Sequence, residues 1–218
     1  FMFIGHYAVG FAAKKWAPKT SLGTLFMAAI WLDVLWPLFV LLDMEHFRVS
    51  PGITKMSPFD FNDYPLSHSL AMSLAWAALW ALVYFILERD TKGACIVGSL
   101  VVSHWVLDAI VHRPDLPLLP APGGKLIGLG LWNSAFGTLF VEVALFAAGL
   151  WLYLKSTKAR DKTGSRSLWV FVIFLLVFYA GSFLGKMPDN PHLIATAGFA
   201  QLLFISWAFW FDDHRKSV

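Results

Sequence analysis

The sequence predicts an all-α fold, a polytopic bundle of transmembrane helices. Of its 218 residues, 58% are hydrophobic and only 14% are charged, whereas roughly a quarter of the residues of a soluble domain are charged. The mean hydropathy is +0.63. Six apolar runs approach the roughly 20 residues that a helix needs to cross a bilayer. We see no low-complexity tract or clear internal repeat, and therefore expect a single transmembrane domain over residues 1–218.

Seven apolar segments follow one another along the chain. The first, residues 1–13, is too short to cross a bilayer, so we expect a half-helix, a re-entrant segment or a truncated first helix. The other six are expected to be full spans: residues 21–42, 66–87, 94–111, 129–154, 168–185 and 192–211. The last two would be additional C-terminal helices in residues 156–218. The candidate site residues discussed below lie in residues 1–155.

Basic residues are shared unevenly between alternate loops. Twelve Lys and Arg fall in one set of segments, and five fall in the other set. The rich segments are 14–19, 88–92, 155–166 and 215–216. Because cytoplasmic loops are enriched in Lys and Arg, we expect these segments and the C-terminus to be cytoplasmic. Lipid headgroups account for the net charge of +3, which needs no nucleic-acid partner.

A polar stripe crosses one of the apolar segments. His104, Asp108 and His112 are spaced at i, i+4 and i+8, so each is rotated by only about 40° from the one before, and the three share a helix face. Ionisable groups in hydrocarbon cost about 2.5–3.5 kcal/mol each on insertion scales. We interpret the stripe as a functional site facing the protein interior. A hydrogen bond between His104 and Asp108 within the helix is an equally good explanation.

Three more ionisable residues are expected at the depth of this stripe, in the outer half of the membrane. They are His6 in the first segment, Asp33 in the second and His68 near the start of the third. Imidazole and carboxylate groups bind zinc and other divalent first-row ions. The sequence therefore predicts a metal site, most simply a zinc site, with five candidate ligands: His6, Asp33, His68, His104 and Asp108.

Asp33 and Asp108 are also the candidate catalytic residues, since a carboxylate that does not bind the metal can accept a proton from water. The sequence does not divide these roles. Packing offers a simpler explanation for each residue alone: His6 as a hydrogen-bonded core residue, and Asp33 as the cap of a helix break before Pro37. Packing alone is a weaker explanation when all five ionisable residues, each costly to place in hydrocarbon, are considered jointly at one depth.

Other polar residues are expected near the site. His112 would lie at its mouth, and Trp132 with Asn133 would line an entrance. Glu142 lies deeper in its helix, where it could be an acid beneath the site. Alternatively, Glu142 bonds serine or Gln201 side chains in the bundle.

Several of these motifs together resemble a bacterial inner-membrane family called predicted membrane-bound metal-dependent hydrolases, which includes a LexA-regulated inner-membrane protein. The resemblance covers roughly residues 1–155 and rests on Gly5-His6-Tyr7 with Gly10, Asp33 near a proline, Ser67-His68-Ser69 and His104-x-x-x-Asp108. The family commonly has Pro-Asp-x-Asp where this chain has Leu32-Asp33-Val34-Leu35, so one carboxylate is missing. The chain is similar to a divergent subgroup, and the resemblance implies a multi-pass protein of the bacterial inner membrane.

Three functions are compatible with these patterns. The first is a metal-dependent hydrolase that acts on a lipid-linked ester or phosphodiester at the outer leaflet. The second is an accessory subunit of a larger membrane complex, whose aromatic faces bind partner helices or pigments. The third is a small transporter or proton relay through Asp108 and Glu142. A GxxxG motif at 181–185 also permits a homodimer.

Overall fold

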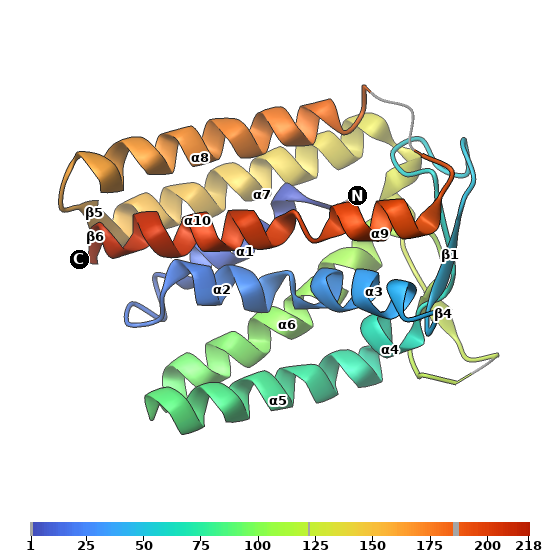
Figure 1. The fold of residues 1–218 in the computed structure, drawn as a ribbon, viewed down its shortest axis with the longest axis horizontal. Coiled ribbons are helices and arrows are strands. Elements are labelled where there is room, and N and C mark those ends of the chain that lie inside the picture. The colour runs from blue at the N-terminus through green and yellow to red at the C-terminus, as the bar shows by residue number, and fades with distance from the viewer. Residues whose placement is uncertain (1, 122, 185–187) are drawn as a thin grey trace.

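The computed structural model describes residues 2–121, 123–184 and 188–218, and in them the chain is mainly helical. The helices are α1 Ile4–Ala13, α2 Leu22–Ala29, α3 Trp31–Leu41, α4 Pro65–His68, α5 Leu70–Glu88, α6 Thr91–Val111, α7 Ala135–Ser156, α8 Lys162–Gly181, α9 Pro191–Gly198 and α10 Gln201–Asp213, with a 3-10 turn at Leu131–Asn133. Figure 1 shows them as a bundle of roughly parallel rods.

Short strands at the two ends of the bundle add to the mainly helical fold that the sequence predicts. They are β1 His46–Val49, β2 Phe59–Asp63, β3 Leu116–Pro117, β4 Leu126–Ile127, β5 Thr157–Ala159 and β6 Arg215–Ser217. Each forms a two-stranded antiparallel sheet with one partner: β1 with β2, β3 with β4, and β5 with β6. All of them lie in loops or at the C-terminus, so the helical core is unaffected.

The helices agree with the expected spans in part. Among the described residues, α5, α6, α7, α8 and the combined α9 and α10 are long and apolar enough to cross a membrane. Helices α2 and α3 form a sixth candidate, bent by 56°. The first segment is short, as expected, with ten residues in α1. Phe1 and Gly185 lie outside the described residues, so only one of the two glycines of the GxxxG motif, Gly181, is described.

Local sequence explains where several helices begin. Ser21, Ser69, Ser134 and Asp161 precede α2, α5, α7 and α8, and each side-chain oxygen accepts a hydrogen bond from a backbone N–H of the first turn. Such caps satisfy donors that a helix leaves unpaired at its start. The cap at Ser69 corrects the start of the span expected at residues 66–87, because His68 belongs to the separate one-turn helix α4 and not to the long helix α5.

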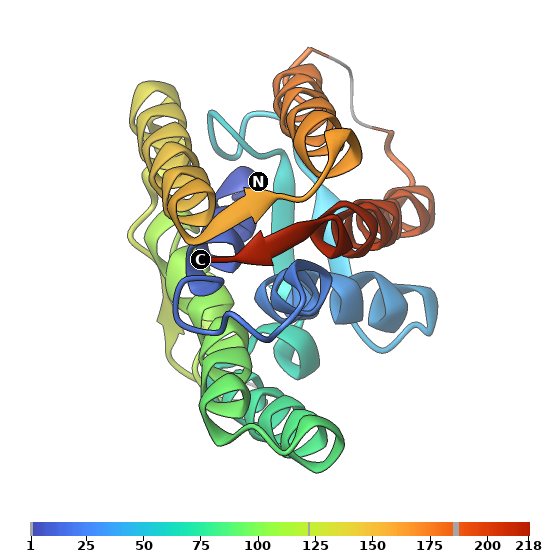
Figure 2. The ribbon, with the colours of Figure 1, turned by 90° about the vertical axis from the view of Figure 1, so that its left-hand side faces the viewer.

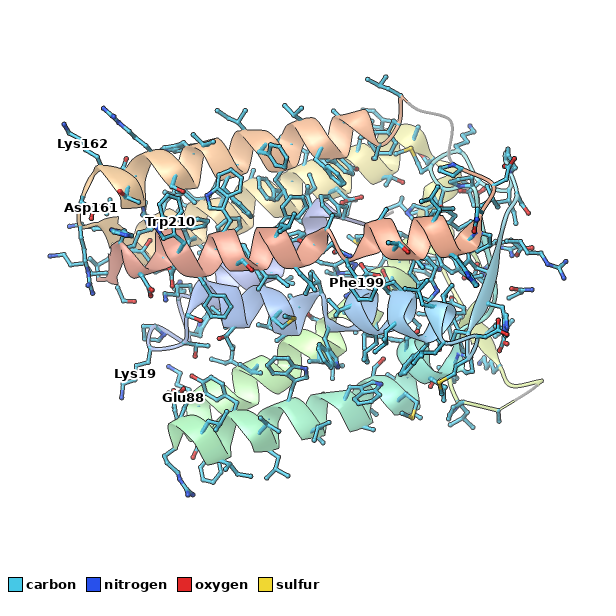
Figure 3. The ribbon with its side chains drawn as sticks, viewed as in Figure 1. Lys19, Glu88, Asp161, Lys162, Phe199 and Trp210 are labelled. Atoms are coloured by element: carbon cyan, nitrogen blue, oxygen red, sulfur yellow. The ribbon has the colours of Figure 1, made fainter. Side chains whose placement is uncertain are left out.

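The basic segments gather at one end of the bundle. Figure 3 labels Lys19, Glu88, Asp161 and Lys162 there, and the paired strands β5 and β6 bring the C-terminus to the same end (Figure 2). The hairpin of β1 and β2 lies at the opposite end (Figure 1). This arrangement agrees with the predicted division of the loops into two sets.

Two hydrophobic clusters make up the core. One joins α5 and α6 with the hairpin of β1 and β2 and with parts of α2, α3 and α9. The other joins most of α1 with α7, α8 and α10. The C-terminal helices are therefore integrated with the earlier ones, and α9 and α10 pack beside α3 and α2.

Helix α7 holds α1 tightly in place. At Gly149, a Cβ atom would collide with the backbone carbonyl of Ala8, so the close approach of the two helices needs glycine. Seven residues earlier, on the same face of α7, Glu142 accepts hydrogen bonds from the backbone N–H groups of Phe3 and Gly5 at 2.9 and 3.2 Å. These contacts fix the position of α1, which carries His6.

Candidate metal centre

The five predicted ligands lie together, although they come from four helices. His6 is on α1, Asp33 on α3, His68 on α4, and His104 and Asp108 on α6. Asp108 is central: its Oδ1 lies 3.2 Å from His6 Nε2, and its Oδ2 lies 3.1 Å from His104 Nε2 and 3.7 Å from His68 Nε2. Asp33 Oδ1 lies 3.7 Å from the Nε2 atoms of both His68 and His104.

His104 is oriented by the bend between α2 and α3. Its Nδ1 lies 2.9 Å from the carbonyl oxygen of Ala29, the last residue of α2, and this carbonyl can only accept. Nδ1 therefore carries the hydrogen, and in the neutral imidazole Nε2 carries a lone pair. That lone pair faces a carboxylate oxygen of Asp108 at 3.1 Å. Two facing acceptors repel each other unless a proton or a metal ion lies between them.

His68 is oriented by a second chain of hydrogen bonds. The Ser67 hydroxyl donates to Glu45 Oε2 at 2.6 Å, so its oxygen is free to accept from His68 Nδ1 at 2.7 Å. Glu45 Oε1 also accepts from the backbone N–H groups of Leu66 and Ser67, both at 2.7 Å. Burial raises the pKa of Glu45 to about 7, against the opposing effect of these hydrogen bonds. His68 Nε2 is left to face Asp33 and Asp108.

His6 completes the cluster by stacking on His104. The two rings are parallel, with centroids 3.8 Å apart and an interplanar angle of 2°. Two imidazolium cations this close would repel each other, so the stack disfavours protonation of both. Among the described residues, His6 Nδ1 and His104 Nε2 are buried without a hydrogen-bond partner.

The donor atoms fit a metal ion. Two overlapping groups, His6 with His104 and Asp108, and Asp33 with His68 and His104, each have ligand atoms within 4.8 Å of one another. Metal-binding histidines usually donate the N–H of their other ring nitrogen to a carboxylate, a backbone carbonyl or water. His104 Nδ1 contacts the Ala29 carbonyl directly, and His68 Nδ1 is linked to the Glu45 carboxylate through the Ser67 hydroxyl, so both rings have the orientation that metal binding uses.

A small cavity of about 20 Å³ adjoins the cluster, with room for about one water molecule. His6, Asp33, His68 and Asp108 line it, together with His112. The aromatic side chains of Trp36, Phe59, Phe61 and Trp132 form much of the remaining wall. The site therefore combines ionisable side chains with a nearly closed cavity whose wall is largely aromatic.

The other predicted site residues are placed differently. His112 lines the cavity as expected, with Nδ1 2.9 Å from Asp115 Oδ1. Trp132 also lines it, whereas Asn133 is exposed and does not. The two oxygens of Glu142 accept from the start of α1 and, at 3.0 Å, from the Tyr179 hydroxyl. Glu142 thus supports the helix that carries His6 and does not bond Gln201.

Sequence reasoning missed the roles of Glu45, Ser67 and the Ala29 carbonyl. Glu45 follows α3 in a loop of mixed charge, where the sequence has no periodic signal. Its complete burial is the feature that distinguishes it from the exposed acids of that loop. Comparison with protein-family models, curated proteins and solved structures finds no match.

Proposed function

We propose that the chain is a metal-dependent hydrolase of a cell membrane that acts on a lipid-linked ester or phosphodiester. The observation that carries this proposal is the contact between the lone pair of His104 Nε2 and the Asp108 carboxylate. A metal ion would fill this contact, and the two overlapping groups of three imidazoles and two carboxylates supply the ligand types that zinc binds. A proton on His104 Nε2 would satisfy that contact, whereas a metal ion would also account for the carboxylate contacts of His6 and His68.

The geometry favours different roles for the two aspartates. Asp108 contacts all three histidines and its side chain is 5% exposed, which suits a ligand. The Asp33 side chain is 13% exposed and lines the cavity, where it can accept a proton from water. A bound zinc ion would activate that water and polarise the ester or phosphoryl oxygen. Trp36, Phe59 and Trp132 would exclude other water from the site.

The resemblance to the predicted membrane-bound hydrolases supports a bacterial inner-membrane location. In the orientation we propose, the Lys- and Arg-rich end and the C-terminus are cytoplasmic. The hairpin of β1 and β2 would then face outward, and the substrate would come from the outer leaflet. Membrane lipids are the partners that this proposal requires, and it requires neither nucleic acid nor a second protein.

The metal content of the detergent-purified protein tests the proposal. We expect about one zinc ion per chain in the wild type and none in the double variant His104→Ala, Asp108→Ala, measured by elemental mass spectrometry. The double variant Asp189→Ala, His192→Ala removes the same residue types from exposed positions and should keep its zinc. Absence of metal from the wild type, purified without chelators, would contradict the proposal and favour the accessory-subunit role.

The Ser67 hydroxyl should tune the affinity of the site. We expect Ser67→Ala to weaken zinc binding by about 10–100-fold, because His68 loses the acceptor that orients its ring. Competition with a zinc chelator measures this change. Ser67→Thr keeps the hydroxyl and should restore affinity. Ser73→Ala removes another buried hydroxyl, which donates to the Ser69 carbonyl, and should have no effect. Equal affinity in all of these variants would show that Ser67 does not orient a ligand.

A further inference from the structure

A second, larger cavity lies beside the candidate metal centre. We call it the lateral cavity; it has a volume of about 180 Å³ and lies between α3, α8, α9 and α10, next to the start of the chain at Phe3. Nine of its twelve lining residues are apolar, among them Trp36, Ile194 and Phe204. Phe199, at the junction between α9 and α10, lies about halfway along the bundle (Figure 3).

The lateral cavity opens on the side of the bundle. Phe178, on its wall, is 45% exposed, and Ser182 and Ala197 are exposed as well. The surrounding surface is strongly apolar: Val177 is 64% exposed and Leu203 71% exposed. A cavity that opens through such a surface is reached from hydrocarbon rather than from water.

At its inner end, the lateral cavity meets the small cavity of the metal centre. Asp33, Trp36 and Phe59 line both. An apolar space and a polar space thus share one wall, and the carboxylate in that wall is the one we assign as the base. A molecule that fills both spaces would be apolar on one side of Asp33 and polar on the other.

From this geometry we infer that the lateral cavity holds one hydrocarbon chain of the lipid substrate, with the bond to be hydrolysed beside Asp33. The inference rests on the proposed function and adds the path and orientation of the substrate. The lipid enters sideways between α8 and α9, its chain packs against Phe178, Ile194 and Phe204, and its polar linkage reaches the small cavity. Burial of a hydrocarbon chain favours this position without any polar contact.

Photo-crosslinking tests the inference. The probe is a phosphatidylglycerol with one diazirine-bearing acyl chain, in vesicles of phosphatidylethanolamine that contain the full-length protein. We expect labelling concentrated in residues 178–182 and 194–204. Ala197→Trp places an indole in the lateral cavity. If it prevents the burial of two methylene groups, labelling should fall roughly tenfold. Thr196→Trp adds the same indole at an exposed neighbour outside the cavity and should label like the wild type.

Zinc content, measured on the same samples, separates this inference from the proposed function. Ala197→Trp should keep its zinc, which also shows that the variant is folded. Ser182→Trp is a second blocking variant, which places an indole on the opposite wall of the cavity. Labelling that is spread evenly over the exposed faces of α5 and α7, or that neither variant reduces, would overturn the inference even if zinc is bound. Focused labelling of a wild type without zinc would support the lipid site and contradict the hydrolase.

Discussion

Purified Asp33→Asn should keep its zinc and lose lipid hydrolysis by about 10²–10⁴-fold, the range that a general base contributes. Asparagine has nearly the same shape as aspartate but cannot accept a proton from water at neutral pH. Asp33 is the more exposed of the two carboxylates, and it lies in the wall shared by the two cavities. Mass spectrometry of the products that appear in vesicles of bacterial inner-membrane lipids measures the change.

A matched control for this variant is Asp43→Asn. Asp43 is exposed and has a φ of 59°, a conformation that asparagine also tolerates. Its replacement should leave both zinc content and hydrolysis unchanged. Loss of zinc from Asp33→Asn would instead make Asp33 a ligand, and unchanged hydrolysis would exclude it as the base.

Asp212→Ala should lower the free energy of unfolding by about 3–5 kcal/mol, the usual cost of leaving a buried charge without its partner. Asp212 Oδ2 accepts from Lys14 Nζ at 2.7 Å and from the backbone N–H of Leu22 at 2.8 Å, and Oδ1 accepts from the Tyr153 hydroxyl at 2.6 Å. These contacts join α10 to α2, to α7 and to the loop after α1. A denaturant titration of the folded protein in mixed micelles measures the loss.

The neighbouring residue provides the control. Asp213 is exposed, so Asp213→Ala should change stability by no more than about 0.5 kcal/mol. Adding Lys14→Met to Asp212→Ala removes the uncompensated cation and should recover part of the lost stability. An equal effect of both alanine variants would show that the buried ion pair does not stabilise the bundle.

The proximity of the five candidate ligands could be predicted from the sequence because the depth of a residue along an apolar helix follows from its position in the sequence. The i, i+4 spacing placed His104 and Asp108 on one face, and the cost of ionisable residues in hydrocarbon indicated that the others should meet them. The structure brings all five together. Whether they hold a metal is a separate matter, which the zinc measurement addresses.

The supporting contacts could not be predicted, since they depend on tertiary position and not on periodicity. The packing explanation of Asp33 placed a helix break before Pro37, but Pro37 lies within α3 and the chain bends at Ile30 instead. That bend directs the Ala29 carbonyl to His104. Glu45 likewise reaches α4 from a loop, and a loop residue carries no signal of which helix it will contact.

The division of the core into two hydrophobic clusters has a consequence for how a bound ion would affect the whole molecule. His104 and Asp108 belong to α6, which packs in one cluster, whereas most of α1, which carries His6, packs in the other. An ion held by residues from both helices would add a cross-link between two clusters that are otherwise joined mainly through α2. A bound ion would therefore stabilise the junction between the two clusters, and its removal would weaken that junction more than the interior of either cluster.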